Sequence, residues 1–377
     1  MLTQDSRLVD FPSLAERTYL NTAAEGIPPL PVINALNQYA QDKILGMDGR
    51  ELHEVQWAEA KSEIAQAYNL TADETGICSC TSEAYNMAAI ALQLQEGDEV
   101  IVNDLDFPAG ATPWLQPACP ASVHVWRSRD GALRVDDLVP LLNAKTRLLT
   151  VSLVSFFNGF KIPLDDVRAA VRRHSSALLA LDVTQALGRV PLDLTDVDFV
   201  VSSTHKWILA SHGGGLVGVP QARAADWTAP AGGWFNIENA FEADRFDHPA
   251  VSKPGAASFT AGMPNYAAVY AINAGLRYIR SVGVENIAEH ADPLLRACIE
   301  GLRALSVDLL TPDEPAALAG IVSFRHEKPA AIQTILRDAD IHIMSTDGRM
   351  RVAIHGYNTA ADVETFLAVL HQALKDV

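Results

Sequence analysis

The sequence has no long hydrophobic run and few basic residues, and each absence excludes a class of protein. No apolar stretch approaches the roughly 18 residues that a membrane span requires, because even the segment 147–157 is broken by polar side chains. The 29 basic residues against 46 acidic ones give a net charge of -17. This charge argues against nucleic acid or an anionic membrane as the main partner. We therefore expect a small-molecule substrate.

Cysteine is also scarce. The four cysteines match neither the ligand spacing of a zinc site nor a disulfide framework for a chain of 377 residues. We expect reduced thiols and no metal site. The start of the chain, Met1 to Val9, lacks the basic and apolar regions of a secretory signal. The cytoplasm is therefore the expected location.

Short runs of β-branched and aliphatic residues alternate with segments of helical spacing from Tyr68 to about Val219. The expected buried strands are 101–103, 122–126, 148–153, 177–181 and 199–202, and the expected helices are 82–94, 135–142 and 164–174. This alternation predicts an α/β fold with a mostly parallel sheet and helices on both faces. Such a sheet binds its ligand at the carboxyl ends of the strands.

The pattern changes after Gly255. A long helix is expected at 266–281, and residues 283–377 mix helices with strands such as 320–324 and 349–353. This mixture indicates a second, smaller α+β domain. The expected division is a large cofactor-binding domain at 18–284 and a small domain at 285–377 together with the N-terminal segment 1–17.

Lysine is uncommon, with 8 residues against 21 arginines, yet Lys206 follows directly on the expected strand 199–202. An amine at the carboxyl edge of a parallel sheet lies where ligands bind. Burial there lowers the pKa of a lysine and makes the neutral amine available to attack a carbonyl. A surface lysine just past a strand is the alternative interpretation.

Asp182 ends another expected buried strand, 24 residues before Lys206. A carboxylate in this position also suits a helix cap. Together the two residues form a testable pair, because pyridoxal phosphate (PLP) requires a Schiff-base lysine and an aspartate that keeps its pyridine nitrogen protonated. At an effective dielectric constant near 20, that ion pair contributes roughly 4 kcal/mol, enough to decide the protonation state.

The phosphate of such a cofactor also needs a binding site. The run CTSEA at residues 80–84 leads from a short strand into a helix. It offers free backbone N–H groups and the hydroxyls of Thr81 and Ser82 at the positive end of the helix. Taken alone, this segment is an ordinary helix start.

These residues resemble the class V aminotransferase group of fold-type I PLP enzymes, which includes cysteine desulfurases, carbon–sulfur lyases, kynureninase and isopenicillin N epimerase. The run from Asp182 through Gln185 to Lys206 carries the resemblance. Further matches occur in order along most of the chain, at residues 19–24, 81–84, 97–100, 259–265 and 351–358. Each segment is weak alone, but their order and spacing together are specific.

The resemblance implies a cofactor role for each matching residue. Lys206 would form the internal aldimine, Asp182 would pair with the pyridine nitrogen, and Gln185 would bind the ring hydroxyl. Phe107 matches the residue that stacks over the cofactor ring. Around the phosphate, the implied residues are Thr81, Ser203 and His205, with the backbone N–H of Ser82.

The resemblance also implies substrate contacts. Arg351 matches the arginine that holds a substrate α-carboxylate, a task suited to its planar fork of donors. Arg349 and Arg325 are nearby rivals, and a surface ion pair is the alternative for an arginine on such a strand. Asn158 and Trp234 are further candidates for substrate binding. Relatives are homodimers with active sites at the subunit interface, and we expect the same here.

Four departures from the family pattern are informative. Phe107 stands where cysteine desulfurases have a stacked histidine, so it cannot shuttle a proton. The segment 342–348 lacks the nucleophilic cysteine of desulfurases, and Cys298 lies far upstream, which argues against sulfur transfer through an enzyme persulfide. Phe156 replaces an asparagine near the ring hydroxyl. Met263 replaces a hydroxyl residue that in relatives reaches the partner's phosphate.

Two other enzyme classes are excluded by missing motifs. The run HGGG at 212–215 is typical of the oxyanion loop of esterases, but no G-x-S-x-G nucleophile elbow exists in the chain. A nicotinamide site fails because no G-x-G-x-x-G opens a helix after the first strand. A non-enzyme alternative is a PLP fold that has lost catalysis and serves as a binding or regulatory module. Retention of Lys206, Asp182 and Arg351 argues against it.

We therefore expect a PLP-dependent enzyme that acts on a small amino acid or derivative through an α-carbanion. Aminotransferase and β-eliminating carbon–sulfur lyase are the first two candidates, and an epimerase or racemase is the third. The shared residues do not separate these reactions.

Overall fold

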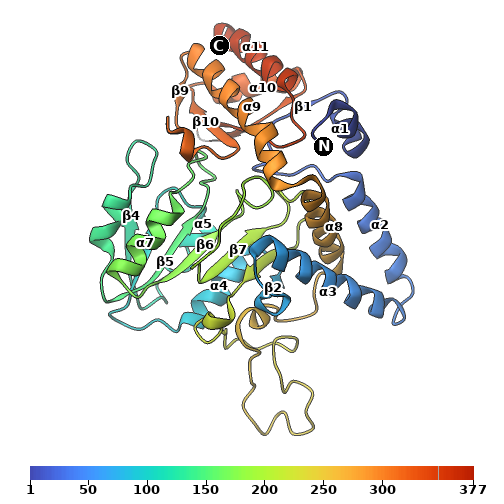
Figure 1. The fold of residues 1–377 in the computed structure, drawn as a ribbon, viewed down its shortest axis with the longest axis vertical. Helices are drawn as coiled ribbons and strands as arrows, with labels where there is room; N and C mark the ends of the chain where they lie inside the picture. Colours follow the sequence, from blue (N-terminus) through green and yellow to red (C-terminus); the bar gives the residue numbers. More distant parts are fainter. Residues whose placement is uncertain (347) are drawn as a thin grey trace.

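The structure is a computed structural model that describes residues 1–346 and 348–377. Its centre is a seven-stranded sheet (Figure 1) with the order β2-β8-β7-β6-β5-β3-β4. The strands are β2 (Thr75–Cys78), β3 (Glu99–Asn103), β4 (Ser122–Trp126), β5 (Thr146–Ser152), β6 (Leu178–Asp182), β7 (Phe199–Ser203) and β8 (Gly215–Gly218). The five strands from β4 to β7 run parallel, whereas β8 pairs antiparallel with both β7 and β2. The α/β fold with a mostly parallel sheet is confirmed.

Helices cover both faces of this sheet, and the strand residues alternate between two cores. Leu179 and Leu181 of β6 join one core with α7 (Leu164–His174) and α8 (Tyr266–Val282). Leu178 and Ala180 point to the other face, where α4 (Thr81–Leu92) packs. Because both faces are covered, β6 is buried along its whole length. The remaining helices of this part are α2 (Leu30–Lys43), α3 (Gly49–Tyr68), α5 (Pro108–Ala111) and α6 (Val135–Leu138).

A second, antiparallel sheet lies at one end of the molecule (Figure 1) and has the order β12-β13-β10-β9. Its strands are β9 (Asp308–Leu309), β10 (Ile321–Arg325), β12 (Met344–Thr346) and β13 (Arg349–Ala353), and its helices are α9 (Val284–Ala304), α10 (Pro329–Asp338) and α11 (Ala360–Asp376). This unit has its own core, centred on residues such as Phe324 and Phe366. Gly283, with φ of 88°, separates α8 from α9.

The N-terminal segment packs against this second unit. Arg7 of α1 (Gln4–Asp10) pairs with Asp362 of α11 at 3.2 Å. The short strand β1 (Thr18–Tyr19) pairs in parallel with β11 (Ile341–His342). The expected boundary between the large and the small domain, between residues 284 and 285, lies next to the turn at Gly283. This division into domains stays a prediction.

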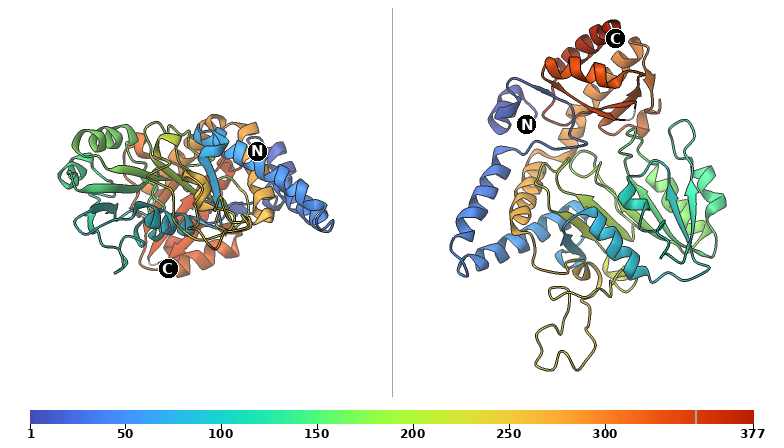
Figure 2. Two further views of the ribbon diagram at one scale, coloured as in Figure 1. Left: turned by 90° about the horizontal axis from the view of Figure 1, so that it is seen from below. Right: turned by 180° about the vertical axis from the view of Figure 1, so that it is seen from behind.

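A long irregular loop projects from the opposite end of the molecule (Figure 2). An isolated bridge between Ile237 and Ser252 closes its base. Phe241 and Phe246, both within this loop, are 77% and 89% exposed. Such exposure of large apolar side chains is typical of a surface that meets another molecule.

One expected element differs from the structure. The helix predicted at 135–142 is divided into α6 and a 3-10 turn at Val139–Leu141. Pro140 has no N–H to donate within an α-helix, so the chain tightens there. Within the described residues, no helix combines the length and apolar character needed to cross a membrane.

Candidate active site

The tips of β6 and β7 bring the two central predicted residues to one sheet edge. Asp182 is the last residue of β6, and Lys206 lies in the turn that follows β7. The backbone N–H of Ser203 donates to the Thr184 hydroxyl at 3.0 Å, which ties the two strand tips together. Thr204 fixes the turn by donating from its hydroxyl to the Ser211 carbonyl at 2.7 Å.

Lys206 lies in a largely buried position. Its Nζ is 5.4 Å from the centre of the Phe107 ring. Burial lowers the pKa of Lys206 from 10.5 to about 8, the charge of Asp182 opposes this shift, and Arg351 adds to it. A substantial fraction of the amine is therefore neutral slightly above neutral pH, which is the form that acts as a nucleophile or base.

Asp182 is 6% exposed. Its Oδ1 accepts a hydrogen bond from the Thr184 backbone N–H at 2.7 Å. Burial raises the pKa of this carboxyl group, while the Thr184 hydrogen bonds and the charge of Lys206 oppose the rise. A cationic ring nitrogen in this position would favour the ionised carboxylate in the same way.

Two of the predicted phosphate residues, Thr81 and Ser203, meet where α4 begins. Thr81 is the first residue of α4, and its Oγ1 lies 3.3 Å from the Ser203 Oγ. Ser82 follows with an exposed side chain. His205 stacks on His212 with ring centres 4.5 Å apart. Burial, Lys206 and His212 lower the pKa of His205 to about 4, so this ring is a neutral hydrogen-bonding group at neutral pH.

Gln185 is buried and held at both ends of its amide. Its Nε2 donates to the Ala23 carbonyl at 3.0 Å, and its Oε1 accepts from the Trp207 indole N–H at 2.7 Å. One amide hydrogen remains for a ligand, because the group carries two. Nothing in the sequence indicates that the Trp207 indole contacts Gln185, because a tryptophan directly after the lysine is typical of a residue of the hydrophobic core.

Arg351 comes to this site from the second sheet. It lies in the middle of β13, is 4% exposed, and donates from Nη1 to the Phe156 carbonyl at 2.8 Å. Its buried Nε has no partner among the described residues. Burial and the neighbouring Arg349 lower the pKa of Arg351 to about 9. The Phe156 ring in turn meets the Phe107 ring edge-on at 5.1 Å, so Arg351 and Lys206 belong to one site.

Two predicted residues are engaged elsewhere. Asn158 is fully buried, and its side-chain amide donates to the carbonyls of Gly131 and Leu310 at 2.7 and 3.2 Å. Trp234 lies at the base of the long loop, where its ring contacts Phe241 at 5.7 Å. No contact in the described part of the chain joins either residue to Lys206, so neither is brought to the site within one chain.

Asp106, for which the sequence predicts no role, also lies at this sheet edge. This residue directly precedes Phe107, and its Oδ1 accepts from the Ser152 backbone N–H at 2.8 Å. Ser152 is the register partner of Asp182 on the neighbouring strand. Burial raises the pKa of Asp106 to about 7, against the hydrogen bonds from Ser152. An acidic residue close behind a buried strand is the signal that could have identified it.

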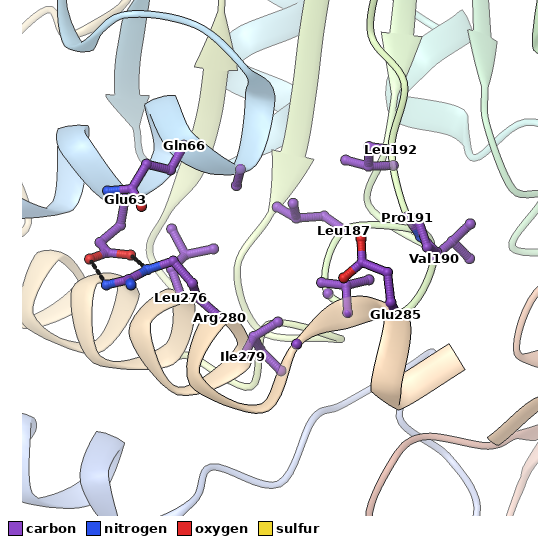
Figure 3. Close-up of a pocket in the computed structure, with 14 residues that line it drawn as sticks. Glu63, Gln66, Leu187, Val190, Pro191, Leu192, Leu276, Ile279, Arg280 and Glu285 are labelled. Carbon is purple, nitrogen blue, oxygen red and sulfur yellow. Dashed lines mark hydrogen bonds and ion pairs between the residues drawn. The ribbon is translucent and has the colours of Figure 1, made fainter. Parts of the chain in front are cut away.

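A separate cavity lies between α3, α8 and the segment 187–192 (Figure 3). It has a volume of about 280 Å³ and is lined mainly by apolar side chains such as Leu187 and Ile279. None of the predicted cofactor or substrate residues lines it. This cavity is therefore distinct from the site around Lys206.

Comparison with known proteins places the chain in a family. The family model described as aminotransferase class-V matches residues 18–366. A probable cysteine desulfurase of Pyrococcus abyssi is 24% identical over 98% of this chain and 97% of its own length. The match to the family model spans most of the sequence.

Solved structures share the fold. The apo structure of a cysteine desulfurase from Thermococcus onnurineus NA1 superposes with a TM-score of 0.90 and 23% identity, covering 100% of this chain and 99% of that one. The cystine C-S lyase C-DES, solved with its reaction product cysteine persulfide, gives a TM-score of 0.85 and 21% identity, covering 96% and 99%. The family match and these folds agree: the chain belongs to the class-V aminotransferase family of PLP-dependent enzymes.

Proposed function

We propose that this protein is a PLP-dependent carbon–sulfur lyase that acts on a small sulfur-containing amino acid. One observation carries the proposal. The largely buried amine of Lys206, with its pKa lowered to about 8, faces the Phe107 ring at the same strand edge as Asp182. Arg351 is a buried cation whose Nε has no hydrogen-bond partner within the described residues. Its guanidinium could therefore bind a carboxylate.

The donor set fits PLP. The hydroxyls of Thr81 and Ser203 meet at the start of α4, where free backbone N–H groups favour a phosphate. Asp182 is available for the ring nitrogen, and Gln185 keeps one amide hydrogen for the ring hydroxyl. Phe107, 45% exposed, offers its face to a planar ring.

Bound PLP would act as an electron sink for the α-carbon of the substrate. Arg351 would hold the substrate α-carboxylate with its planar fork and so orient the Cα–H bond. Lys206 would then remove the α-proton and hold it on Nζ, a role for which a pKa near the working pH is best. Asp182 would accept a hydrogen bond from the ring nitrogen at its carboxylate. Phe107 and Phe156 would exclude water from this side of the site.

In a β-elimination, the electron pair of the Cα–H bond forms a Cα–Cβ double bond. The Cβ–S bond breaks, and its electron pair leaves with the sulfur. No cysteine is needed to receive that sulfur. The sequence has no cysteine between residues 342 and 348, a segment in which Asp347 lies outside the described part. Cys298 is buried in the core of the second unit. The sulfur would therefore leave in a small product. The reaction product of the cystine C-S lyase C-DES, cysteine persulfide, is such a small molecule.

The test is a screen of the PLP-loaded protein with cystine, cysteine and other β-substituted amino acids. Pyruvate, ammonia and a sulfur product formed without any α-keto acid would support the lyase. Conversion to the pyridoxamine form, with product only when a keto acid is present, would instead identify an aminotransferase. Borohydride should fix the cofactor on Lys206, and Lys206→Ala should abolish that linkage; a linkage that persists would refute the assignment.

The assembly belongs to the proposal as well. We expect a homodimer located in the cytoplasm that acts on a small-molecule amino acid and binds neither nucleic acid nor a membrane. Exposed apolar side chains on the turn between α2 and α3 support self-association, since Ile44 and Met47 are 78% and 73% exposed. In the dimer, Trp234 and Met263 would approach the partner's site. Sedimentation of the purified protein and cell fractionation test these two expectations.

A further inference from the structure

His355 connects the second sheet to the turn that carries Lys206. It follows β13 by two residues and is fully buried. Its Nε2 lies 2.8 Å from the Trp207 carbonyl oxygen, and its Nδ1 lies 2.7 Å from the backbone nitrogen of Gly356. Trp207 is the residue directly after Lys206, so this contact holds the Trp207–Ile208 peptide within the turn that carries the lysine.

These contacts fix the state of the imidazole. A carbonyl oxygen only accepts and a backbone N–H only donates, so Nε2 carries the hydrogen and Nδ1 accepts. Burial lowers the pKa of His355 to about 3, against the Trp207 hydrogen bond, and Arg189 lowers it further. His355 is therefore a neutral, fixed donor rather than an acid or base.

The chain of hydrogen bonds continues from Trp207 to the cofactor residues. The indole N–H of Trp207 donates to the Gln185 Oε1 at 2.7 Å. The indole itself is confined, because Gly320 approaches so closely that a Cβ there would lie 2.9 Å from the ring. A shift of the Trp207 carbonyl would therefore displace Trp207 and, through it, both the adjoining Lys206 and the amide of Gln185.

The same segment is tied to Arg351. His355 lies four residues after Arg351, and the Nε of the buried Arg189 donates to the intervening Ile354 carbonyl at 2.9 Å. Arg189 in turn pairs with Asp292 of α9 at 2.7 Å. Two hydrogen bonds thus hold the end of the Arg351 strand against the turns that carry Gln185 and Lys206.

We propose that His355 is a positioning residue that, by holding the Trp207–Ile208 peptide, sets the turn that carries Lys206 and the side chain of Gln185 in register with Arg351. This inference rests on the proposed roles of Lys206 and Arg351. It gives His355 no contact with substrate or cofactor. Its effect is to keep the amine that holds the α-proton and the guanidinium that holds the carboxylate at one fixed separation.

Two substitutions separate this role from mere packing. In His355→Gln the amide nitrogen reaches the place of Nε2 and keeps a donor for the Trp207 carbonyl. In His355→Asn the amide reaches only the place of Nδ1, so the turn at Gly356 is kept and the Trp207 contact is lost. His290→Asn is the matched control, because His290 on α9 makes a 2.8 Å hydrogen bond to the Asn358 carbonyl, and within the described residues no hydrogen bond joins it to Trp207.

The first readout is the pH midpoint of the lysine-linked cofactor absorbance, measured without substrate on protein loaded with PLP. We expect His355→Asn to shift this midpoint by about half a pH unit or more and to lower kcat about tenfold, within the range that small misplacements cost. His355→Gln should stay within about twofold of the wild-type kcat. His290→Asn should match the wild type in both measurements.

An unshifted midpoint in folded His355→Asn, or a His355→Gln variant as impaired as His355→Asn, would overturn the inference. If His355→Asn does not fold, Trp207→Phe removes the next link to Gln185, and an unshifted midpoint there would overturn it equally. A wild-type protein that binds PLP on Lys206 but turns over no amino acid would refute the proposed function alone, because the midpoint comparison needs no substrate.

Discussion

Holding the charged amine of Lys206 in its largely buried position lowers the stability of the folded apoprotein. Burial and the nearby Arg351 both disfavour its charged form. In an unfolded chain the same amine would have its ordinary pKa of 10.5. Since the folded pKa is about 8, the unfolded state binds the proton more strongly between these two values. The free energy of unfolding of the apoprotein should therefore fall as the pH drops from about 10.5 to about 8, and the penalty should be complete below 8.

Lys206→Met should remove this penalty. We expect the apo variant to be more stable than the apo wild type at pH 7, by on the order of 3 kcal/mol, with the difference shrinking above pH 8. Urea unfolding at several pH values measures it. Lys145→Met, at an exposed position, is the control and should leave the pH dependence unchanged. A Lys206→Met variant no more stable than the wild type at pH 7 would contradict the lowered pKa of the lysine.

Arg351 gives a second prediction for a single residue. Arg351→Gln removes the cation and the planar fork, so KM for the amino acid should rise about ten- to hundredfold, as for loss of a charge-assisted hydrogen bond. The pKa of Lys206 should rise too, because a nearby positive charge is lost. Acylation of Lys206 in the apoprotein, followed against pH, measures this shift. Arg351→Lys keeps the charge, so it should preserve that pKa while KM still rises; an unchanged KM would exclude the carboxylate role.

At the scale of secondary-structure elements, the junction between α4 and β7 should govern cofactor retention. Thr81→Ala and Ser203→Ala each remove one of the two hydroxyls that meet at 3.3 Å, and each should weaken PLP binding about tenfold. Equilibrium dialysis or fluorescence quenching gives the dissociation constant.

The control for that junction is Thr359→Ala. Thr359 caps α11 of the second unit through a capping box with Asp362, whereas Thr81 and Ser203 lie on α4 and β7 of the large-sheet unit. Loss of this cap in Thr359→Ala should lower the free energy of unfolding by about 1 kcal/mol and leave the affinity for PLP unchanged. Equal PLP affinity in wild type, Thr81→Ala and Ser203→Ala would show that the phosphate is held elsewhere.

The strands of the large sheet could be predicted from sequence because their burial is continuous. Residues such as Leu178 to Leu181 face two covered surfaces, so every position is apolar, and the charged Asp182 marks the end of the run. The position of Lys206 followed from the same rule, since the end of a buried strand fixes where the next turn begins. These signals are local in the chain.

The pairing of distant segments could not be read in this way. The placement of β8 between β7 and β2, with antiparallel pairing on both sides, depends on contacts between residues far apart in sequence. The same holds for Asn158, whose amide is taken by the Gly131 and Leu310 carbonyls. The contact of His355 with Trp207 joins residues 148 positions apart, so neither residue alone carried a signal for it.

At the scale of the whole molecule, the two sheets form one site because β13 delivers Arg351 to the edge of the large sheet. Further exposed apolar side chains include Ile44 and Met47 on the α2–α3 turn and Phe241 and Phe246 on the projecting loop. Figure 2 shows the course of that loop. Burial of Ile44 or Met47 would contribute a favourable free energy of roughly 1.5–3 kcal/mol for each side chain, and this is absent while they are exposed to water. In the homodimer proposed above, a second copy of the chain would cover these side chains, and Trp234 and Met263 would approach the partner's site.

Ile44→Glu therefore tests the assembly and the site together. A charged side chain at a buried interface costs several kcal/mol, so the variant should sediment as a monomer at concentrations where the wild type is a dimer. Loss of the dimer should also weaken PLP retention, because the partner's Met263 region would no longer close the phosphate side. Val9→Glu, at an exposed apolar position on α1, is the control and should stay dimeric with normal PLP affinity. A monomeric Ile44→Glu variant that binds PLP and turns over substrate like the wild type would show that each chain holds a complete site.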